Sequence, residues 1–124
     1  MNAGDFRSTF EAWLDESLSS PIPPEVVSYL FNLSEPWSID LVGCGSYDAD
    51  DPDWGCDEVF SPAPHVLDLP ESVVGGDWET VLENCKRMIA DYLGRESAGS
   101  AVLKAATAVA VGFVDGDAEL VWPR

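Results

Sequence analysis

Apolar side chains repeat at helical spacing in the first segment of this chain. Between residues 6 and 18 they recur mainly every three or four positions, which places them on one face of a helix. This apolar stripe consists of Phe6, Phe10, Trp13, Leu14 and Leu18. We expect the helix to end near Ser19, Ser20 and Pro21, because a proline disfavours helical backbone in the residue before it.

A second, shorter helix is expected to begin at Pro23 and Pro24, since proline is tolerated at the first helical position. Pro36 would end this helix. Its buried side would consist of Val26, Val27, Leu30 and Phe31.

From Trp37 the apolar period changes to two, which is the pattern of a half-buried strand. Three apolar residues alternate with two polar ones: Trp37, Ile39 and Leu41 with Ser38 and Asp40. Residues 43–45, Gly-Cys-Gly, are expected to weaken or bulge the end of this strand. Short strand pieces are expected at 59–60 and 65–67. Pro62 and Pro64 confine them to a sheet edge or to irregular structure.

The most regular helix is expected between residues 78 and 93. Asp77 is a good N-cap, Glu79 suits the positive end of the helix dipole, and Gly94 stands where a C-terminal glycine belongs. The apolar stripe of this helix consists of Val81, Leu82, Cys85, Met88, Ile89, Tyr92 and Leu93.

The C-terminal segment predicts a β-hairpin. It follows a loop at 95–100 and a small-residue stretch, 101–106, which the pattern leaves unassigned. Residues 107–114 are typical of a buried strand, and Asp115-Gly116 is a strong hairpin turn signal. Residues 118–122 would return as the second strand.

This order of elements indicates an α+β fold in a single domain, 1–124. A small antiparallel sheet with the C-terminal hairpin would be covered on one face by the central 78–93 helix. The two N-terminal helices would pack at one end of the sheet or beside it. Four side chains are expected to be buried together: Leu82, Ile89, Phe113 and Leu120. The length of 124 residues suits one domain that buries roughly two-thirds of its unfolded surface.

Charge adds a preference for one class of partner. The net charge is −17, and between Arg7 and Lys86 there is no Lys or Arg, but there are seventeen Asp and Glu. The rest of the chain is balanced, with six acids and six bases. Such asymmetry produces a directional field that favours cationic partners. It argues against nucleic acid and anionic membranes as direct ligands, because both are bound through Lys and Arg.

Other features indicate a folded cytoplasmic protein. The hydrophobic content of 46% is ample for a packed core. No apolar run reaches the roughly 18 residues of a membrane span, and the first residues do not read as a secretory signal. Three widely spaced cysteines, Cys44, Cys56 and Cys85, favour cytosolic thiols, with a Cys44–Cys56 disulfide as the alternative.

The acidic segment 48–58 is the sharpest candidate site. Its candidate partner-binding residues are Asp48, Asp50, Asp51, Asp53, Trp54, Asp57 and Glu58. Carboxylates around one Trp fit a protein-binding surface, since aromatic anchors are enriched at interface hot spots. A solvated acidic loop and a calcium site are the alternatives. The EF-hand spacing fails, because a start at Asp48 puts Asp53 where glycine is required.

No arrangement of residues indicates catalysis, a metal or a cofactor. His65 is the only histidine, and no motif places a partner that would make it a general base. Cys85 falls on the apolar stripe of the 78–93 helix and is expected to be an inert core thiol. A four-ligand zinc site would need all three cysteines together with His65. We therefore expect a protein that is not an enzyme and has no cofactor.

The chain resembles, in type, the immunity proteins of bacterial toxin systems, which include small, strongly acidic α+β proteins. The acidic loop 48–58 and the tail 109–122 carry this resemblance. It implies direct binding to a basic toxin domain, in many systems a nuclease, and it assigns no role to any single residue. Clustered carboxylates suit that task, because they can occupy a phosphate-receiving site and steer association.

Three other functions fit the same features. A DNA mimic would use the charge against a repressor or a histone-like protein. A salt-adapted housekeeping protein would also be acidic, although a uniform distribution of charge would be expected there. A small enzyme or ligand-binding domain would show a pocket with converging polar groups.

Overall fold

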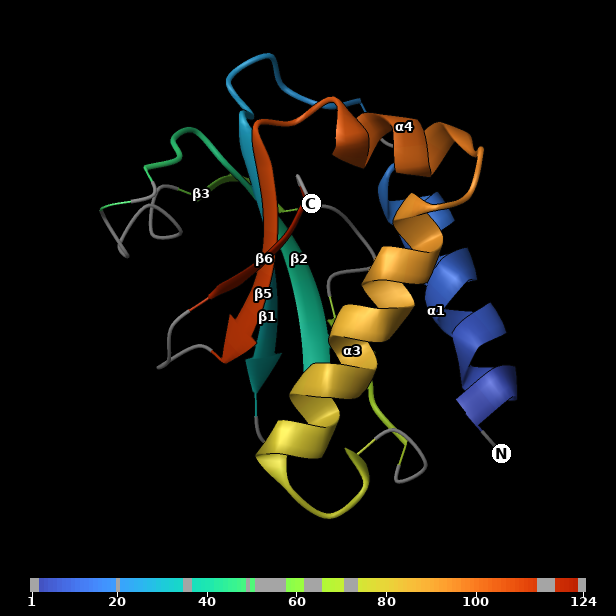
Figure 1. The fold of residues 1–124 in the computed structure, drawn as a ribbon. Helices are drawn as coiled ribbons and strands as arrows, with labels where there is room; N and C mark the ends of the chain where they lie inside the picture. The colour runs from blue at the N-terminus through green and yellow to red at the C-terminus, as the bar shows by residue number, and fades with distance from the viewer. Residues whose placement is uncertain are drawn as a thin grey trace.

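The described part of the chain is an α+β fold of three helices and one six-stranded sheet (Figure 1). The structure is a computed structural model, and it describes residues 3–19, 21–34, 37–48, 50, 58–61, 66–70, 74–113 and 118–122, with side chains from residue 6 onward. The helices are α1 (Ala3–Ser17), α3 (Trp78–Leu93) and α4 (Ala98–Lys104). The strands are β1 (Ser28–Ser34), β2 (Ser38–Cys44), β3 (Glu58–Phe60), β4 (Val66–Asp68), β5 (Ala108–Phe113) and β6 (Glu119–Trp122).

The sheet is mixed at its centre. The strand order is β3-β2-β1-β5-β6, and β4 also pairs with β2. Every pair is antiparallel except β1–β5, which is parallel. The predicted antiparallel sheet is therefore corrected at this pair. Parallel neighbours need a long crossover connection, and here the intervening chain includes α3 and α4.

The predicted second N-terminal helix is wrong, because residues 28–34 form the strand β1. Tyr29, Phe31 and Leu33 are buried in the main core, whereas Leu30 packs with Ala110 in a smaller cluster. Closely spaced apolar residues can fit either a helix or a strand. Pairing with β2 on one side and β5 on the other satisfies the backbone groups of the extended form.

The predicted edge strands and the strand at 37–41 are confirmed. The strand predicted at 37–41 corresponds to β2. Its pairing with β3 shifts register between Gly43 and Cys44, within the segment where the sequence predicts a weakened or bulged end. β3 and β4 both pair with the outer side of β2, as the nearby prolines require. His65 lies outside the described residues.

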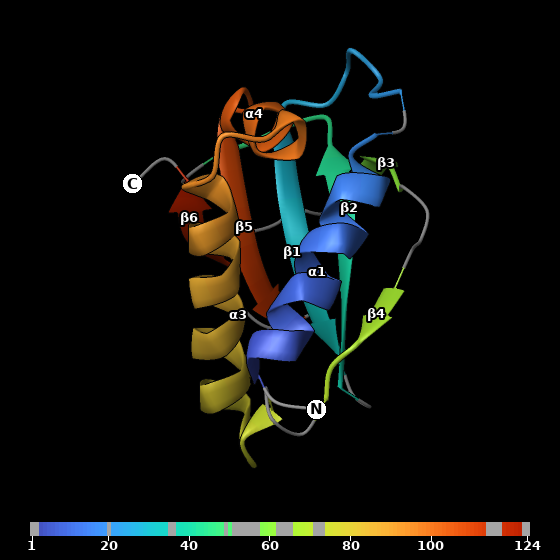
Figure 2. The same cartoon turned by 90° about the vertical axis from the view of Figure 1, so that its right-hand side faces the viewer.

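Two helices, α1 and α3, lie over one face of the sheet (Figure 2). The predicted apolar stripes of both helices are buried in the main core together with β1, β2 and β5. Phe10 and Trp13 of α1 contact each other and Phe31 of β1, with ring centroids 5.8–6.5 Å apart. This aromatic contact ties α1 to the central strand.

The ends of α3 are capped, with one difference from the prediction. Asp77 is confirmed as the N-cap, since its carboxylate accepts the N–H of Thr80 at 2.7 Å. Gly94 ends the helix by donating to the carbonyls of Ala90 and Asp91. Its φ of −77° is right-handed, so this position does not need the conformational freedom of glycine.

The C-terminal strand pairing is confirmed, and a short helix precedes it. β5 and β6 pair antiparallel, while the Asp115-Gly116 turn lies outside the described residues. Residues 98–104, expected as part loop and part unassigned, form α4. Its N-cap is Ser97, whose hydroxyl accepts the N–H of Ser100 at 3.1 Å.

The predicted core is confirmed at two of its four positions. Leu82 and Ile89 are buried, and Phe113 is half-buried against the same core. Leu120 contradicts the prediction, because 48% of it is exposed. It pairs with Ala110, which belongs to the cluster on the face opposite α1 and α3. Strand register alone decides which face a side chain occupies.

Candidate protein-binding surface

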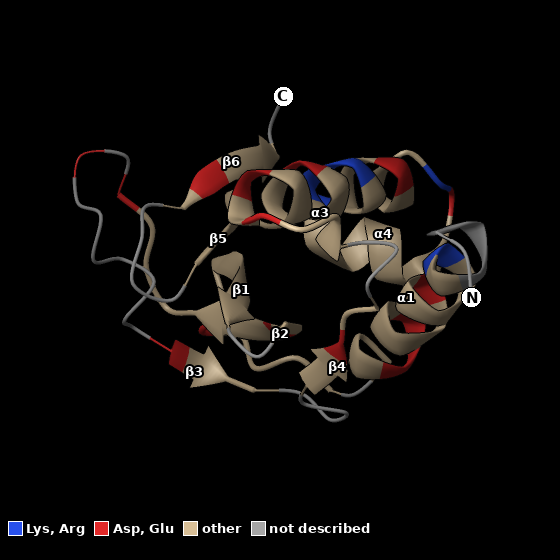
Figure 3. Cartoon of the chain, turned by 90° about the horizontal axis from the view of Figure 1, so that it is seen from below, with Lys and Arg blue, Asp and Glu red and all other residues tan. Residues whose placement is uncertain are grey.

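Three acidic side chains of β2, β3 and β4 share the face of the sheet opposite α1 and α3. Asp40 lies in β2, Glu58 begins β3 and Asp68 ends β4. Asp68 stands opposite Ser38, and Glu58 stands opposite Cys44 of the smaller cluster. Side chains alternate along a strand, so the even positions of β2 all point to this face. We call Asp40, Glu58 and Asp68 the acidic edge, and red segments mark β3 and β4 in Figure 3.

Charge is segregated between the strands and the helices. None of the six described strands contains a Lys or an Arg. The bases in the described residues stand on the helices or just after them, and several are paired with acids. These ion pairs are Arg7–Asp91 (2.7 Å), Arg95–Glu11 (2.7 Å), Lys86–Glu83 (3.3 Å) and Lys86–Glu119 (3.0 Å). The helix side therefore carries both signs, whereas the acidic edge carries only one (Figure 3).

Exposed apolar side chains accompany the acidic edge. Val66, 48% exposed, is the strand partner of Asp40, and Val59, 40% exposed, follows Glu58. Leu120 adds an exposed apolar side chain on the same face, on the far side of β5. Protein interfaces combine apolar contact area with a polar rim, and these strands offer both.

Asp40 holds an acceptor that no described residue satisfies. Its Oδ1 is buried and has no hydrogen bond. A buried unsatisfied acceptor costs roughly 1–3 kcal/mol. Stability therefore does not explain this carboxylate, and an amide can replace it without loss of a hydrogen bond at Oδ1.

The sequence-predicted site lies partly within the described residues. Asp48 and Asp50 are exposed in the connection after β2, and the Asp48 carboxylate accepts the N–H of Asp50 at 2.9 Å. Glu58 is exposed at the start of β3 and joins the predicted loop to the acidic edge. The remaining candidates lie outside the described residues: Asp51, Asp53, Trp54 and Asp57.

Sequence reasoning did not single out Asp40 and Asp68 as site residues. The alternation around Asp40 indicates that it points away from the core, which is the only local signal. That Asp68 and Glu58 share its face follows from the pairing of β4 and β3 with β2. Such pairing joins residues distant in sequence and leaves no local trace.

The candidate metal ligands and the cysteine of α3 can be placed where they fall within the described residues. Among them, no three His, Cys, Asp or Glu side chains group closely enough to hold a metal ion. Cys85 is a buried thiol, and burial raises its pKa from 9.0 to about 12. A protonated, buried thiol is unreactive, which confirms the expectation of an inert core cysteine. Cys56 lies outside the described residues.

Comparisons with known proteins assign no family to this chain. No family model, no curated protein and no solved structure matches it. Within the described part of the chain, none of the helices has the length and apolar character that crossing a membrane requires.

Proposed function

We propose that this protein is a binding module that neutralises a basic toxin by covering its functional surface, as bacterial immunity proteins do. The observation that supports the proposal most directly is the segregation of charge. Asp40, Glu58 and Asp68 share one face on strands without a single Lys or Arg. A field of one sign over one face attracts and orients a cationic partner.

The acidic edge and the carboxylates of Asp48 and Asp50 would act first, during encounter. Complementary charge raises association rates to about 10⁸–10⁹ M⁻¹s⁻¹ at low salt. The exposed Val66, which is the strand partner of Asp40, would act afterwards, because apolar area that becomes buried at an interface slows dissociation. Carboxylates seated in a site built for phosphates would block the partner without any reaction by this chain.

The test is binding to a candidate basic toxin domain, sought first among the neighbouring genes and measured by surface plasmon resonance at low and at physiological salt. The triple variant Asp40→Asn/Glu58→Gln/Asp68→Asn should associate at least about tenfold more slowly at low salt, within the range over which charge steers encounter. Physiological salt should shrink the difference, since its Debye length is about 8 Å.

A matched control is the triple variant Glu16→Gln/Glu83→Gln/Glu96→Gln. It makes the same change in net charge at exposed acids that stand on α1, on α3 and just after α3, and it should associate at close to the wild-type rate. Equal slowing by both triple variants would reduce the effect to net charge and overturn the proposal. A partner that proves to be a repressor or histone-like protein would make the chain a DNA mimic instead.

A further inference from the structure

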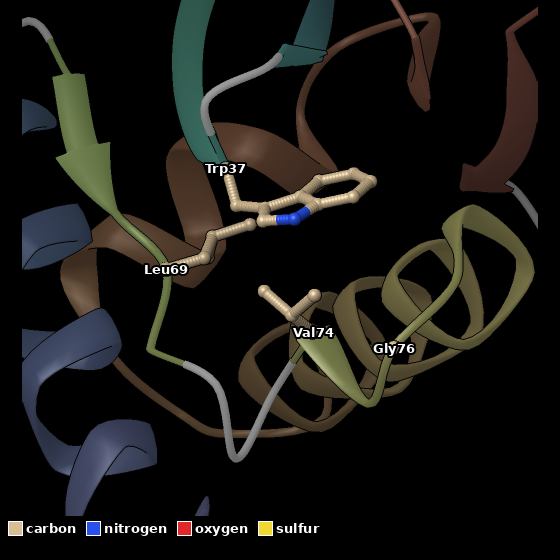
Figure 4. Close-up of a pocket in the computed structure, with 4 residues that line it drawn as sticks. All are labelled: Trp37, Leu69, Val74 and Gly76. Atoms are coloured by element: carbon tan, nitrogen blue, oxygen red, sulfur yellow. The ribbon is translucent and has the colours of Figure 1, made fainter.

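An apolar hollow opens where α3 begins and β2 starts, at the end of the sheet that includes Phe113 (Figure 4). Its volume is about 390 Å³, within the roughly 300–1,000 Å³ of typical ligand sites. Trp37, Leu69, Val74 and Gly76 line it. In Figure 4 the Leu69 and Val74 side chains point into the hollow, and the Trp37 indole lies across it.

Two glycines form the turn beside this hollow. Gly75 and Gly76 have φ values of +66° and +99°, in the left-handed region where other residues are strained. A Cβ placed on Gly76 would meet no atom within 4 Å, so space remains beside the turn. The turn brings the chain from Val74 directly into the N-cap of α3.

Trp37, which lines the hollow, begins a row of three aromatic rings in contact. Trp37 packs edge to face with Phe113 at 6.1 Å, and Trp78 packs edge to face with Phe113 at 6.0 Å. Trp78 is 55% exposed, the highest value among the exposed large apolar residues of the described chain. An exposed indole offers a surface for cation–π contact, for which Trp is the best side chain.

Two exposed carboxylates follow Gly76 of the hollow in the chain. Asp77 and Glu79 are both exposed in the first turn of α3. The backbone N–H of Thr80 lowers the pKa of Asp77, so its carboxylate is ionised at neutral pH. The nearest base along α3 is Lys86, which lies about 10.5 Å of helix rise beyond Glu79 at 1.5 Å per residue and is already paired with acids.

We infer that this hollow binds one arginine side chain presented by a basic polypeptide. The aliphatic stem would lie on Leu69 and Val74. The guanidinium would lie against Trp78, with the carboxylates of Asp77 and Glu79 close by. An apolar floor beneath an anionic, aromatic rim matches a ligand that has a hydrocarbon stem and a planar cationic head. The inference goes beyond the acidic edge, and no toxin is needed to test it.

The test is NMR titration of the ¹⁵N-labelled protein with N-acetyl-arginine-methylamide. The Trp37 indole N–H and the amide of Gly76 should shift in a saturable manner. The citrulline analogue, which has nearly the same shape and no charge, is the matched ligand control and should shift neither signal appreciably. Trp78→Ala should weaken arginine binding about two- to fivefold, the value of an exposed cation–π contact.

Variants separate the hollow from general attraction to an acidic protein. Val74→Phe should fill the hollow and abolish binding, and the dispersed spectrum of the variant would show that it is folded. Asp77→Asn/Glu79→Gln keeps a capping side chain and should weaken binding about two- to fivefold, as expected for exposed charge pairs. The control Glu16→Gln/Glu96→Gln, with equal charge change elsewhere, should leave binding unchanged.

Three results would overturn the inference. Arginine binding that leaves the Trp37 and Gly76 signals unmoved would place the ligand elsewhere. Equal binding of the citrulline analogue would make the occupant an apolar group and not a cation. Folded Trp78→Ala protein with unchanged arginine affinity would remove the aromatic rim from the site. None of these results bears on the acidic edge, whose test uses different residues and a different ligand.

Discussion

At the scale of single residues, Tyr92 of α3 packs closely against both α1 and α4. The Tyr92 ring is fully buried, and its hydroxyl donates to Asp15 of α1 at 2.7 Å. Gly99 of α4 lies so close to this hydroxyl that a Cβ at position 99 would overlap it. One hydroxyl thus joins three helices, and the close approach requires glycine in α4.

Gly99→Ala is expected to destabilise the protein by about 1–3 kcal/mol, the usual cost of overpacking. The loss should appear although alanine favours a helix by up to about 1 kcal/mol over glycine. Urea denaturation measures the free energy of unfolding. Gly94→Ala is the matched control, because Gly94 has a right-handed φ and a Cβ there would make ordinary contacts of 3.5 and 3.6 Å. It should be neutral or stabilising by up to about 1 kcal/mol.

Removing the Tyr92 hydroxyl tests whether a collision with this hydroxyl causes the loss of stability in Gly99→Ala. Tyr92→Phe alone loses the hydrogen bond to Asp15, but it also makes room for the methyl group of alanine at 99. The double variant Tyr92→Phe/Gly99→Ala should therefore lose less stability than the two single losses together. Simple additivity, as for distant sites, would contradict a collision between these two residues.

At the scale of elements, the face that a strand residue occupies is decided by the neighbouring strand. β5 directs Val109 to the main core and Ala110 to the opposite face. β6 pairs with β5 through a register shift between these two residues. As a result Leu120 is half exposed, while Trp122 packs against the core and its indole N–H donates to the carbonyl of Lys104 at 3.1 Å.

Two leucine truncations that remove the same atoms measure this difference in burial. Leu82→Ala in α3 should cost about 2–5 kcal/mol, because it empties a packed site. Leu120→Ala in β6 should cost less than about 0.5 kcal/mol, as at most exposed positions. Thermal or urea unfolding of both variants provides the comparison. A similar large loss at both positions would show that β6 pairs in another register.

At the scale of the whole molecule, electrostatic repulsion opposes folding. The net charge is −17, and the ion pairs of the helices involve side chains that are largely exposed. Exposed pairs are worth only about 0–1 kcal/mol each. A surplus of one sign favours the expanded chain through self-repulsion. Salt screens this repulsion, so the folded state should become more stable as salt is added.

We expect the free energy of unfolding to rise with sodium chloride from 0.01 to 0.1 M, as the Debye length falls from about 30 to about 10 Å. The triple variant at the acidic edge should be more stable than wild type at the lower salt concentration, and the gap should narrow as salt is added. Urea denaturation at both concentrations measures this. A wild-type protein that salt destabilises would mean that attractive pairs outweigh the repulsion.

Much of the fold could be predicted because its signals are local. The stripe of α3 and its cap at Asp77 depend on residues within a few turns of one another, and both are confirmed. The same holds for the stripe of α1 and for the alternation around Asp40 in β2. The confinement of charge is also a property of the chain. The binding site proposed from it stays a prediction at every position, because the structure contains no partner.

The sequence by itself determined the helices α1 and α3, the two-residue period of β2 and the acidity of the segment before Lys86, because each depends on near neighbours. Only the tertiary structure decided that 28–34 is a strand, that it lies parallel to β5, and that Leu120 faces solvent. It also brought Asp40, Glu58 and Asp68 to one face. The physical reason is that strand pairing satisfies backbone groups between distant segments, and its register assigns every side chain to a face.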